Sequence, residues 1–385
     1  MKMEELNRRS FIGSVAALTG TAALSGCQTT GGATTSRSIG TGAPATTLRE
    51  AGQQRGVDFG VMLDRRQLRR PDIHSWMGTH FNLVANLGEE IEWDANEAGT
   101  PSFSGLNTFL SSAAKASVTP RLRQIYSWEA APKRAHLRAD GSPKSPAELE
   151  ATLIKRVNQV CDRLNPNSSM TIQVMDEFLE PAGTGPRQDA FGKVLGEGLI
   201  ETLFYATRER MPRARLTYQE FGMVADPDNY FRSKTGAHLK LLERLKKKGV
   251  PIDGAAIGGF VFPPSNNAPI LNASYFNRLA DIGIGFHWNE LTMIYGKRDS
   301  ERRYRPASVA AHDARVVRDY SRVVKFLLRY PNTKEITFFA PIDGDNIVQR
   351  GTLGLTPWEG ARPGLFTRDL QPKQVYKELL EIAAR

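Results

Sequence analysis

Acidic side chains end two apolar stretches of this sequence. Residues 169–181 read SMTIQVMDEFLEP, in which a run of strand-forming residues leads to Asp176 and Glu177. Residues 282–290 read IGIGFHWNE and end on Glu290. Acids at a strand end can simply face water or cap the next helix. Two carboxyl groups that meet in a folded chain can instead share acid–base and nucleophilic chemistry.

Short β-rich stretches alternate with helical patterns along the chain, and this alternation predicts the elements that carry the acids. Helical spacing is clear at Leu149, Leu153 and Val157. The predicted strands are 57–64, 80–85, 121–127, 171–176, 215–220, 254–260, 283–289 and 335–341. Eight strand–helix repeats predict an α/β fold, a single (β/α)8 TIM barrel, with its chemistry at the C-terminal strand ends. Strands four and seven face each other there, so we expect Glu177 and Glu290 to meet.

The N-terminus resembles a twin-arginine export signal that ends in a lipobox. Residues 7–13 (NRRSFIG) precede a weakly apolar run and then Cys27. The resemblance implies a signal peptide over 1–26 and a lipidated Cys27 with a flexible tether over 27–47, which leaves the (β/α)8 domain over 48–385. We expect an exported, membrane-anchored lipoprotein that faces the periplasm or the cell surface. Gln28 is a hint of the outer membrane.

The composition narrows the classes of partner and cofactor. The chain holds 51 Lys and Arg against 41 Asp and Glu, a net charge of +10, which suggests an anionic partner such as an acidic polysaccharide or a membrane surface. We find no zinc-finger spacing and no aromatic RNA-binding signature, so we expect no nucleic-acid partner. Metal-binding, redox and nucleotide-binding motifs are also missing from the sequence, so we expect no metal and no cofactor. We expect a monomer.

The order of several motifs resembles glycoside hydrolase family 10, the endo-β-1,4-xylanases. The matching segments are 80–82 with 92–94, Trp128 with Pro132, 174–177, 287–290, Asp343 with 363–366, and 372–376. The resemblance implies that Glu177 is the general acid/base and Glu290 the nucleophile of a retaining glycosidase, in which the two carboxyl groups lie about 5 Å apart. It further implies that His287 orients Glu290 and that Trp128 forms a wall of the subsite. Burial in the core is the alternative for His287 and Trp128.

The sequence departs from the family pattern mainly at the positions that bind the sugar in the family. Asp176 replaces an Asn that donates to the 2-hydroxyl of the sugar, and an ionised Asp can only accept. Gln124 replaces a His, Phe339 a Trp, and Gly258 and Phe260 stand for the Gln and His of strand six. The resemblance places Asp176, Gln124, Phe339, Asn289 and Glu220 among the substrate-binding residues. A retained catalytic pair with an altered binding shell suggests a glycan other than xylan, or a site no longer used.

A basic loop follows the seventh predicted strand. Residues 297–305 (KRDSERRYR) include Arg302 and Arg303, which could pair with the carboxylates of uronic acids. The alternative is an ordinary solvated loop. We therefore expect a retaining endo-β-1,4-glycanase that acts on an acidic bacterial exopolysaccharide or a xylan-like glycan. A non-catalytic polysaccharide-binding lipoprotein on the same scaffold stays open.

Overall fold

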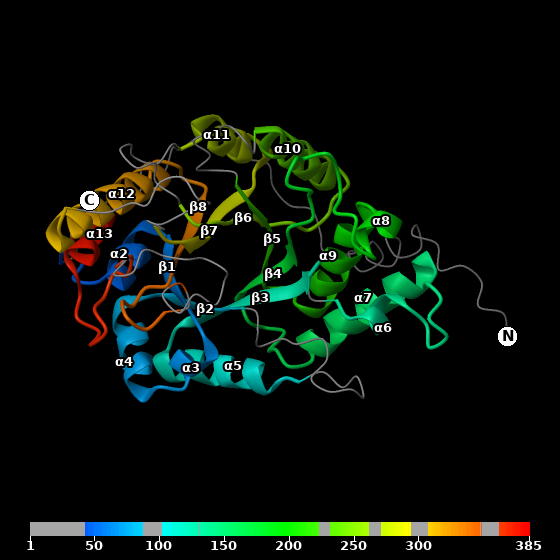
Figure 1. The fold of residues 1–385 in the computed structure, drawn as a ribbon, viewed down its shortest axis with the longest axis horizontal. Helices are drawn as coiled ribbons and strands as arrows, with labels where there is room; N and C mark the ends of the chain where they lie inside the picture. Colours follow the sequence, from blue (N-terminus) through cyan, green and yellow to red (C-terminus); the bar gives the residue numbers. More distant parts are fainter. Residues whose placement is uncertain are drawn as a thin grey trace, which may run out of the picture. The chain divides into compact units, whose positions relative to one another are not determined.

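Eight parallel strands close into a barrel in the computed structural model of the protein (Figure 1). The structure describes residues 43–87, 102–129, 131–222, 232–261, 271–293, 307–346, 348 and 362–385. Residues 44–385 form one compact unit. The strands are β1 (Asp58–Leu63), β2 (Leu83–Asn86), β3 (Thr119–Ser127), β4 (Thr171–Asp176), β5 (Arg215–Phe221), β6 (Gly254–Gly258), β7 (Gly285–Leu291) and β8 (Thr333–Phe339). Each strand pairs in parallel with its sequence neighbours, and β8 returns to β1.

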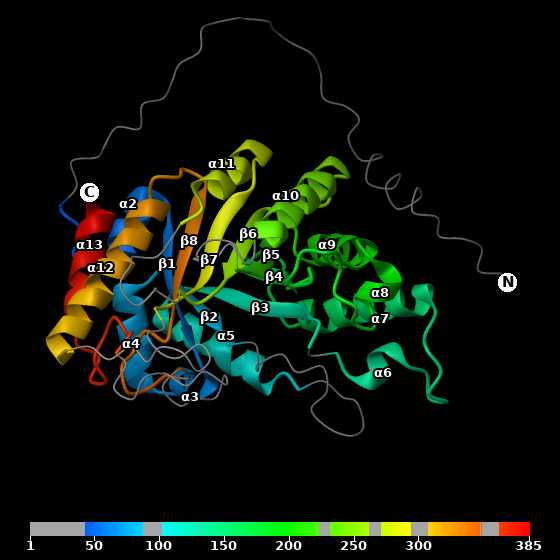
Figure 2. The same ribbon diagram turned by 45° about the horizontal axis from the view of Figure 1, so that its top comes forward.

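Helices surround this ring of strands, as Figures 1 and 2 show. They are α2 (Leu48–Arg55), α3 (Arg65–Leu68), α4 (Pro71–His80), α5 (Ser104–Ala116), α6 (Lys133–His136), α7 (Pro146–Cys161), α8 (Gly192–Leu195), α9 (Gly198–Arg210), α10 (Arg232–Lys247), α11 (Ala273–Ile282), α12 (Val309–Leu327) and α13 (Gln374–Ala384). Local sequence explains their starts: Ser145 and Glu148 form a capping box on α7, with Pro146 at its first position. No helix among the described residues is long and apolar enough to cross a membrane.

Strand alternation separates an apolar outer layer from a polar interior. In β7 the ring of Phe286 lies 4.4 Å from that of Phe276 on α11, on the helix side of the sheet. Asn289, of opposite parity, donates to Gln173 Oε1 of β4 at 2.7 Å, inside the barrel. A fully buried ion pair also lies inside, with Arg121 Nε 2.6 Å from Glu335 Oε1.

The predicted barrel and the number and order of its strands are confirmed, with errors at strand ends. His80, predicted to begin the second strand, is the last residue of α4, and β2 begins at Leu83. Residues 80–85 (HFNLVA) look like one strand in the sequence, but His80 completes the helix. The His80 Nδ1 lies 2.8 Å from the Tyr376 hydroxyl. Cys161 lies buried at the end of α7.

Candidate active site

Strand β4 places two acids at the mouth of the barrel. All six residues of β4 are buried, including its last residue, Asp176. Glu177 follows with φ 51°, in the left-handed region, and its main-chain N–H donates to the Gln219 carbonyl at 2.9 Å. Such a conformation costs a non-glycine residue about 1 kcal/mol or more and persists only where the surroundings enforce it. The chain therefore turns sharply at Glu177, whose side chain stays 27% exposed.

Arg187 and Trp128 hold one oxygen of Glu177. Arg187 Nη2 lies 2.6 Å from Glu177 Oε2, and Arg187 Nε donates to the Glu177 carbonyl at 2.8 Å. Trp128 Nε1 donates to the same Oε2 at 3.3 Å, and the Arg187 guanidinium lies 4.3 Å from the centre of the Trp128 ring. Glu177 Oε1 makes no hydrogen bond within the described chain. It is the oxygen available to a ligand.

Arg123 of β3 joins the acids of strands four and seven. Its Nη1 lies 2.8 Å from Glu290 Oε1 and its Nη2 lies 3.4 Å from Asp176 Oδ2. Asn86 of β2 accepts a hydrogen bond of 2.7 Å from the Arg123 main-chain N–H, and Arg123 Nη1 also donates to the Leu87 carbonyl at 3.2 Å. One guanidinium thus contacts a carboxylate at the end of β4 and a carboxylate of β7.

Asp176 lies in an environment that disfavours its charge. Burial raises its pKa well above the usual range; Arg123 opposes this shift, whereas Glu177, Glu290 and Glu220 add to it. Its Oδ1 is buried without a hydrogen-bond partner among the described residues. A protonated Asp176 can donate a hydrogen bond, which the ionised side chain assumed from the sequence cannot do.

Two predicted site residues have other partners. His287 lies inside the barrel, where its Nδ1 is 3.1 Å from Glu335 Oε2, so the predicted hydrogen bond to Glu290 is wrong. Burial lowers the pKa of His287, which favours the neutral ring. Glu220 is fully buried, 2.7 Å from Lys234 Nζ, and accepts from the Leu179 N–H at 2.7 Å, so its predicted contact with substrate is wrong as well.

Three further predicted substrate-binding residues bond or pack against other side chains of the protein. Gln124 Oε1 accepts from Gln173 Nε2 at 3.0 Å. Asn289 is fully buried, and Phe339, 2% exposed, packs against Phe260 at a ring distance of 5.0 Å. The remaining predicted residues, Cys27, Arg302, Arg303 and segment 92–94, lie outside the described residues.

Sequence reasoning missed the two arginines of the site. Arg123 stands inside a predicted strand, and a charged residue at such a position was the available signal. Arg187 comes from the loop after β4, where no pattern marked it. Among the described residues no group of three or more His, Cys, Asp or Glu side chains is arranged to hold a metal ion.

A parallel (β/α)8 barrel carries its chemistry at the C-terminal ends of its strands, and carboxyl groups placed there are the groups that a glycoside hydrolase needs. Residues 47–382 match the model of glycosyl hydrolase family 10, and the chain belongs to that family.

Known relatives and structures agree with this assignment. Endo-1,4-beta-xylanase 5 of Pyricularia oryzae is 24% identical over 198 residues, which cover 51% of this chain and 44% of the relative. Endo-1,4-beta-xylanase C of Paenibacillus barcinonensis is 26% identical over 263 residues, 63% of this chain and 23% of the relative. The chain thus spans less than half the length of these relatives. A family 10 endoxylanase from a sugarcane soil metagenome superposes with a TM-score of 0.74 at 16% identity, over 87% of this chain and 99% of that one. Native xylanase 10B of Thermotoga maritima gives 0.70 at 17%, over 88% and 98%. At such identities the likeness shows the fold.

Proposed function

We propose that the protein is a retaining endo-β-1,4-glycanase in which Glu177 is the acid/base and Glu290 the nucleophile. The observation that carries the proposal is the Arg123 guanidinium, which touches both Asp176 and Glu290 and so joins the acids of β4 and β7. Membership of family 10, whose curated relatives are named endo-1,4-beta-xylanases, supports the same reaction.

The reaction divides between the two glutamates. Glu290 attacks the anomeric carbon while Glu177 gives its proton to the departing glycosidic oxygen, which leaves a glycosyl ester on Glu290. Glu177 then takes a proton from water, and that water releases the sugar from the ester. Glu177 Oε1 is the oxygen that has no partner in the described chain, whereas Arg187 and Trp128 keep Oε2 in place. Arg123 holds the attacking carboxylate of Glu290 in position through a contact of 2.8 Å.

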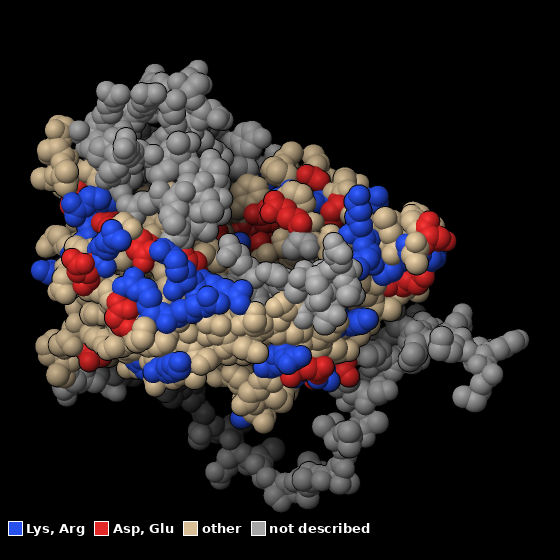
Figure 3. Space-filling model, turned by 60° about the horizontal axis from the view of Figure 1, so that its bottom comes forward, with Lys and Arg blue, Asp and Glu red and all other residues tan. Residues whose placement is uncertain are grey.

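For the substrate we propose an acidic bacterial exopolysaccharide, or a xylan-like glycan. The net charge of +10 supports an anionic polymer. One face of the molecule is hollowed and lined by acidic side chains, with Lys and Arg gathered in a band beside the hollow (Figure 3). The replacement of the sugar-binding Asn by Asp176 supports a glycan other than plain xylan.

Release of reducing ends from polysaccharides tests the proposed reaction. The full chain is incubated with xylan, mixed glucans and a glucuronate-rich exopolysaccharide, with Glu290→Ala as the blank and Arg329→Ala as the matched control. Arg329 follows α12, at the opposite end of the barrel. We expect release that Glu290→Ala abolishes and Arg329→Ala retains. Equal release by Glu290→Ala would refute the assigned nucleophile.

A non-catalytic polysaccharide-binding lipoprotein is the second candidate. The 2.6 Å contact between Arg187 and Glu177 favours it, because this ion pair already engages one oxygen of the carboxyl group assigned as acid/base. Binding of a polymer without release of reducing ends would support this candidate over hydrolysis.

We also propose export by the twin-arginine route and lipidation of Cys27. The order of paired arginines, apolar run and cysteine supports this placement. In cells fed a labelled fatty acid, we expect the label to reach the parent and Cys161→Ala but not Cys27→Ala. Equal labelling of Cys27→Ala would refute the proposal.

A further inference from the structure

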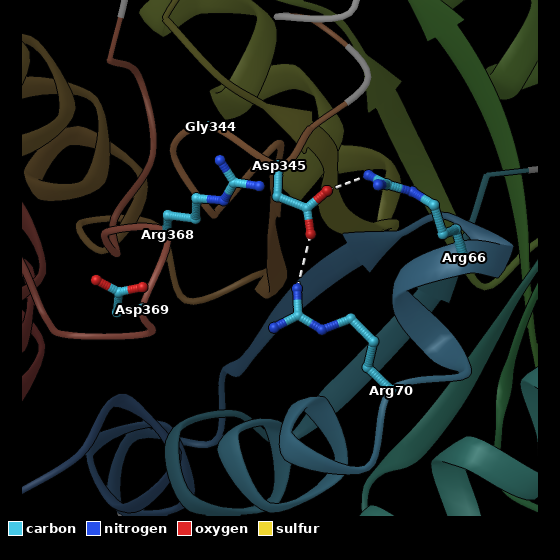
Figure 4. Close-up of a pocket in the computed structure, with 6 residues that line it drawn as sticks. All are labelled: Arg66, Arg70, Gly344, Asp345, Arg368 and Asp369. Atoms are coloured by element: carbon cyan, nitrogen blue, oxygen red, sulfur yellow. Dashed lines mark hydrogen bonds and ion pairs between the residues drawn. The ribbon is translucent and has the colours of Figure 1, made fainter.

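A second polar pocket lies at the mouth of the barrel, away from the two glutamates. Its cavity of about 390 Å³ is lined by Arg66, Arg70, Gly344, Asp345, Arg368 and Asp369 (Figure 4). Arg66 and Arg70 follow the C-terminal end of β1, and Asp345 follows that of β8. The pocket therefore opens at the same end of the barrel as Glu177 and Glu290.

Asp345 orients two of the arginines. Its carboxylate, 9% exposed, lies 2.7 Å from Arg70 Nη1 through Oδ2 and contacts Arg66 through Oδ1. Arg70 also donates to Asp72, through Nε at 3.2 Å and Nη2 at 2.5 Å, so most of its donors are engaged. A guanidinium has five N–H groups, and Arg66 keeps donors that Asp345 does not use. The Arg66 side chain is 62% exposed, which leaves those donors accessible from solvent.

Arg368 brings a third guanidinium to the pocket from another segment. Its side chain extends toward the loop of Asp345, whereas the Asp369 carboxylate lies to the far side (Figure 4). Arg368 forms no ion pair and no hydrogen bond with any residue in the described part of the chain. Its segment is docked on the loop after β8, because the Asp343 N–H donates to the Phe366 carbonyl at 2.9 Å. A fixed, exposed and unpaired arginine beside two oriented ones is suited to an anion.

A buried apolar cluster lies under the strand ends between this pocket and β7. Met62 at the end of β1, Ala85 of β2, and Phe339 and Ala340 at the end of β8 pack in one cluster. In the ring of strands β8 and β1 follow β7, which carries Glu290. A polymer cut between Glu177 and Glu290 can therefore continue over β8 and β1 and reach the arginines.

We propose that the pocket of Arg66, Arg70 and Arg368 binds the carboxylate of a uronic acid residue in the polysaccharide, several sugars from the cleaved bond. This inference rests on the proposed function, because it assumes that a glycan lies across the barrel mouth. Arg368 pairs with the carboxylate through two parallel N–H groups, the free donors of Arg66 complete the site, and Arg70 holds Asp345 in place beside them.

Calorimetric binding with the full chain carrying Glu290→Gln, which prevents turnover, tests this site. The ligands are β-1,4-linked glucuronic acid oligosaccharides and β-1,4-linked glucose oligosaccharides of equal length, which differ only in the group at carbon 6. We expect the added change Arg368→Ala to weaken binding of the acidic ligand about tenfold and to leave the neutral ligand unaffected. Arg66→Ala is a second variant with the same expectation, and Arg329→Ala should affect neither ligand.

The proposal would be overturned by unchanged binding of the acidic ligand by Arg368→Ala, by an equal loss of binding for both ligands, or by no binding of the acidic ligand by the parent. Free glucuronate as strong a ligand as the oligosaccharide would overturn the polymer-bound carboxylate in favour of a small acid. The proposed hydrolysis is tested separately. If Arg368→Ala weakened binding of the acidic ligand but the protein released no reducing ends, the pocket would be supported and the hydrolysis refuted.

Discussion

Replacement of Asp176 by Asn tests the central electrostatic feature of the site. Asp176 is 5% exposed, and burial raises its pKa well above the usual range despite Arg123. Unfolding returns the pKa to about 3.9, so between that pH and the raised folded value the folded protein binds the extra proton. Stability therefore falls as pH rises across this window, by about 1.4 kcal/mol for each pH unit, and is constant above it.

Asn at position 176 carries no charge and removes this loss. We expect the free energy of unfolding of Asp176→Asn, relative to the parent, to increase as the pH rises from about 3.9 towards the raised pKa of Asp176, by about 1.4 kcal/mol for each pH unit. Urea denaturation at several pH values measures it, with Asp281→Asn as the control because that side chain is 66% exposed on α11. A stability difference between Asp176→Asn and the parent that does not change with pH would refute the reasoning.

The same substitution should alter the pH dependence of catalysis. Below the raised pKa, Asp176 carries a proton and can donate to a sugar hydroxyl as Asn does. Above that pKa the donor is lost and a negative charge is added beside Glu177 and Glu290. We expect the alkaline limb of kcat/KM to move to higher pH in Asp176→Asn, with little change at acidic pH. Superimposable pH profiles would show that Asp176 has no such role.

Three further substitutions probe other parts of the structure. Lys234→Met leaves Glu220 buried without its cation and should cost about 3–5 kcal/mol in urea unfolding; a loss below 1 kcal/mol would contradict this pairing. Arg187→Ala frees the Glu177 carboxyl and should lower kcat about 10- to 100-fold in initial rates; an increase in kcat would instead mean that Arg187 restrains the acid. Leu203→Ala opens a cavity under α9, where Leu203 is fully buried, and should cost about 2–5 kcal/mol by thermal denaturation; a shift in melting temperature no larger than that of Arg329→Ala would contradict it.

The barrel could be predicted because each strand–helix repeat has its own local signal. Apolar runs of strand length alternate with helical spacing, and a parallel sheet with eight such repeats closes on itself. Strand ends were less predictable: His80 continues an apolar run in sequence yet finishes α4, because helix ends depend on the contact with Tyr376 as much as on the run itself.

The positions of Glu177 directly after β4 and of Glu290 on β7 could also be predicted, but the contacts of their neighbours could not. Successive strand residues face opposite sides of the sheet, so a site residue predicted one position too early or too late lies on the wrong side. On β5 the predicted Glu220 faces Lys234, whereas Gln219 points inward to Asn289. His287 does face inward, but it meets Glu335 of β8, a partner 48 positions away that no local pattern could indicate.

Asp176 and Arg123 have to be understood together. From the sequence, Asp in place of Asn adds a charge where the family has a donor, which argues against catalysis. In the structure the added carboxyl lies beside Arg123, which also reaches Glu290, so the cation of β3 compensates two acids on different strands. A buried cation shared in this way lessens the repulsion between Asp176 and Glu290 without removing the burial that favours a protonated Asp176. The substitution thus keeps a hydrogen-bond donor at the site only while Asp176 holds its proton, which makes donation to the sugar depend on pH.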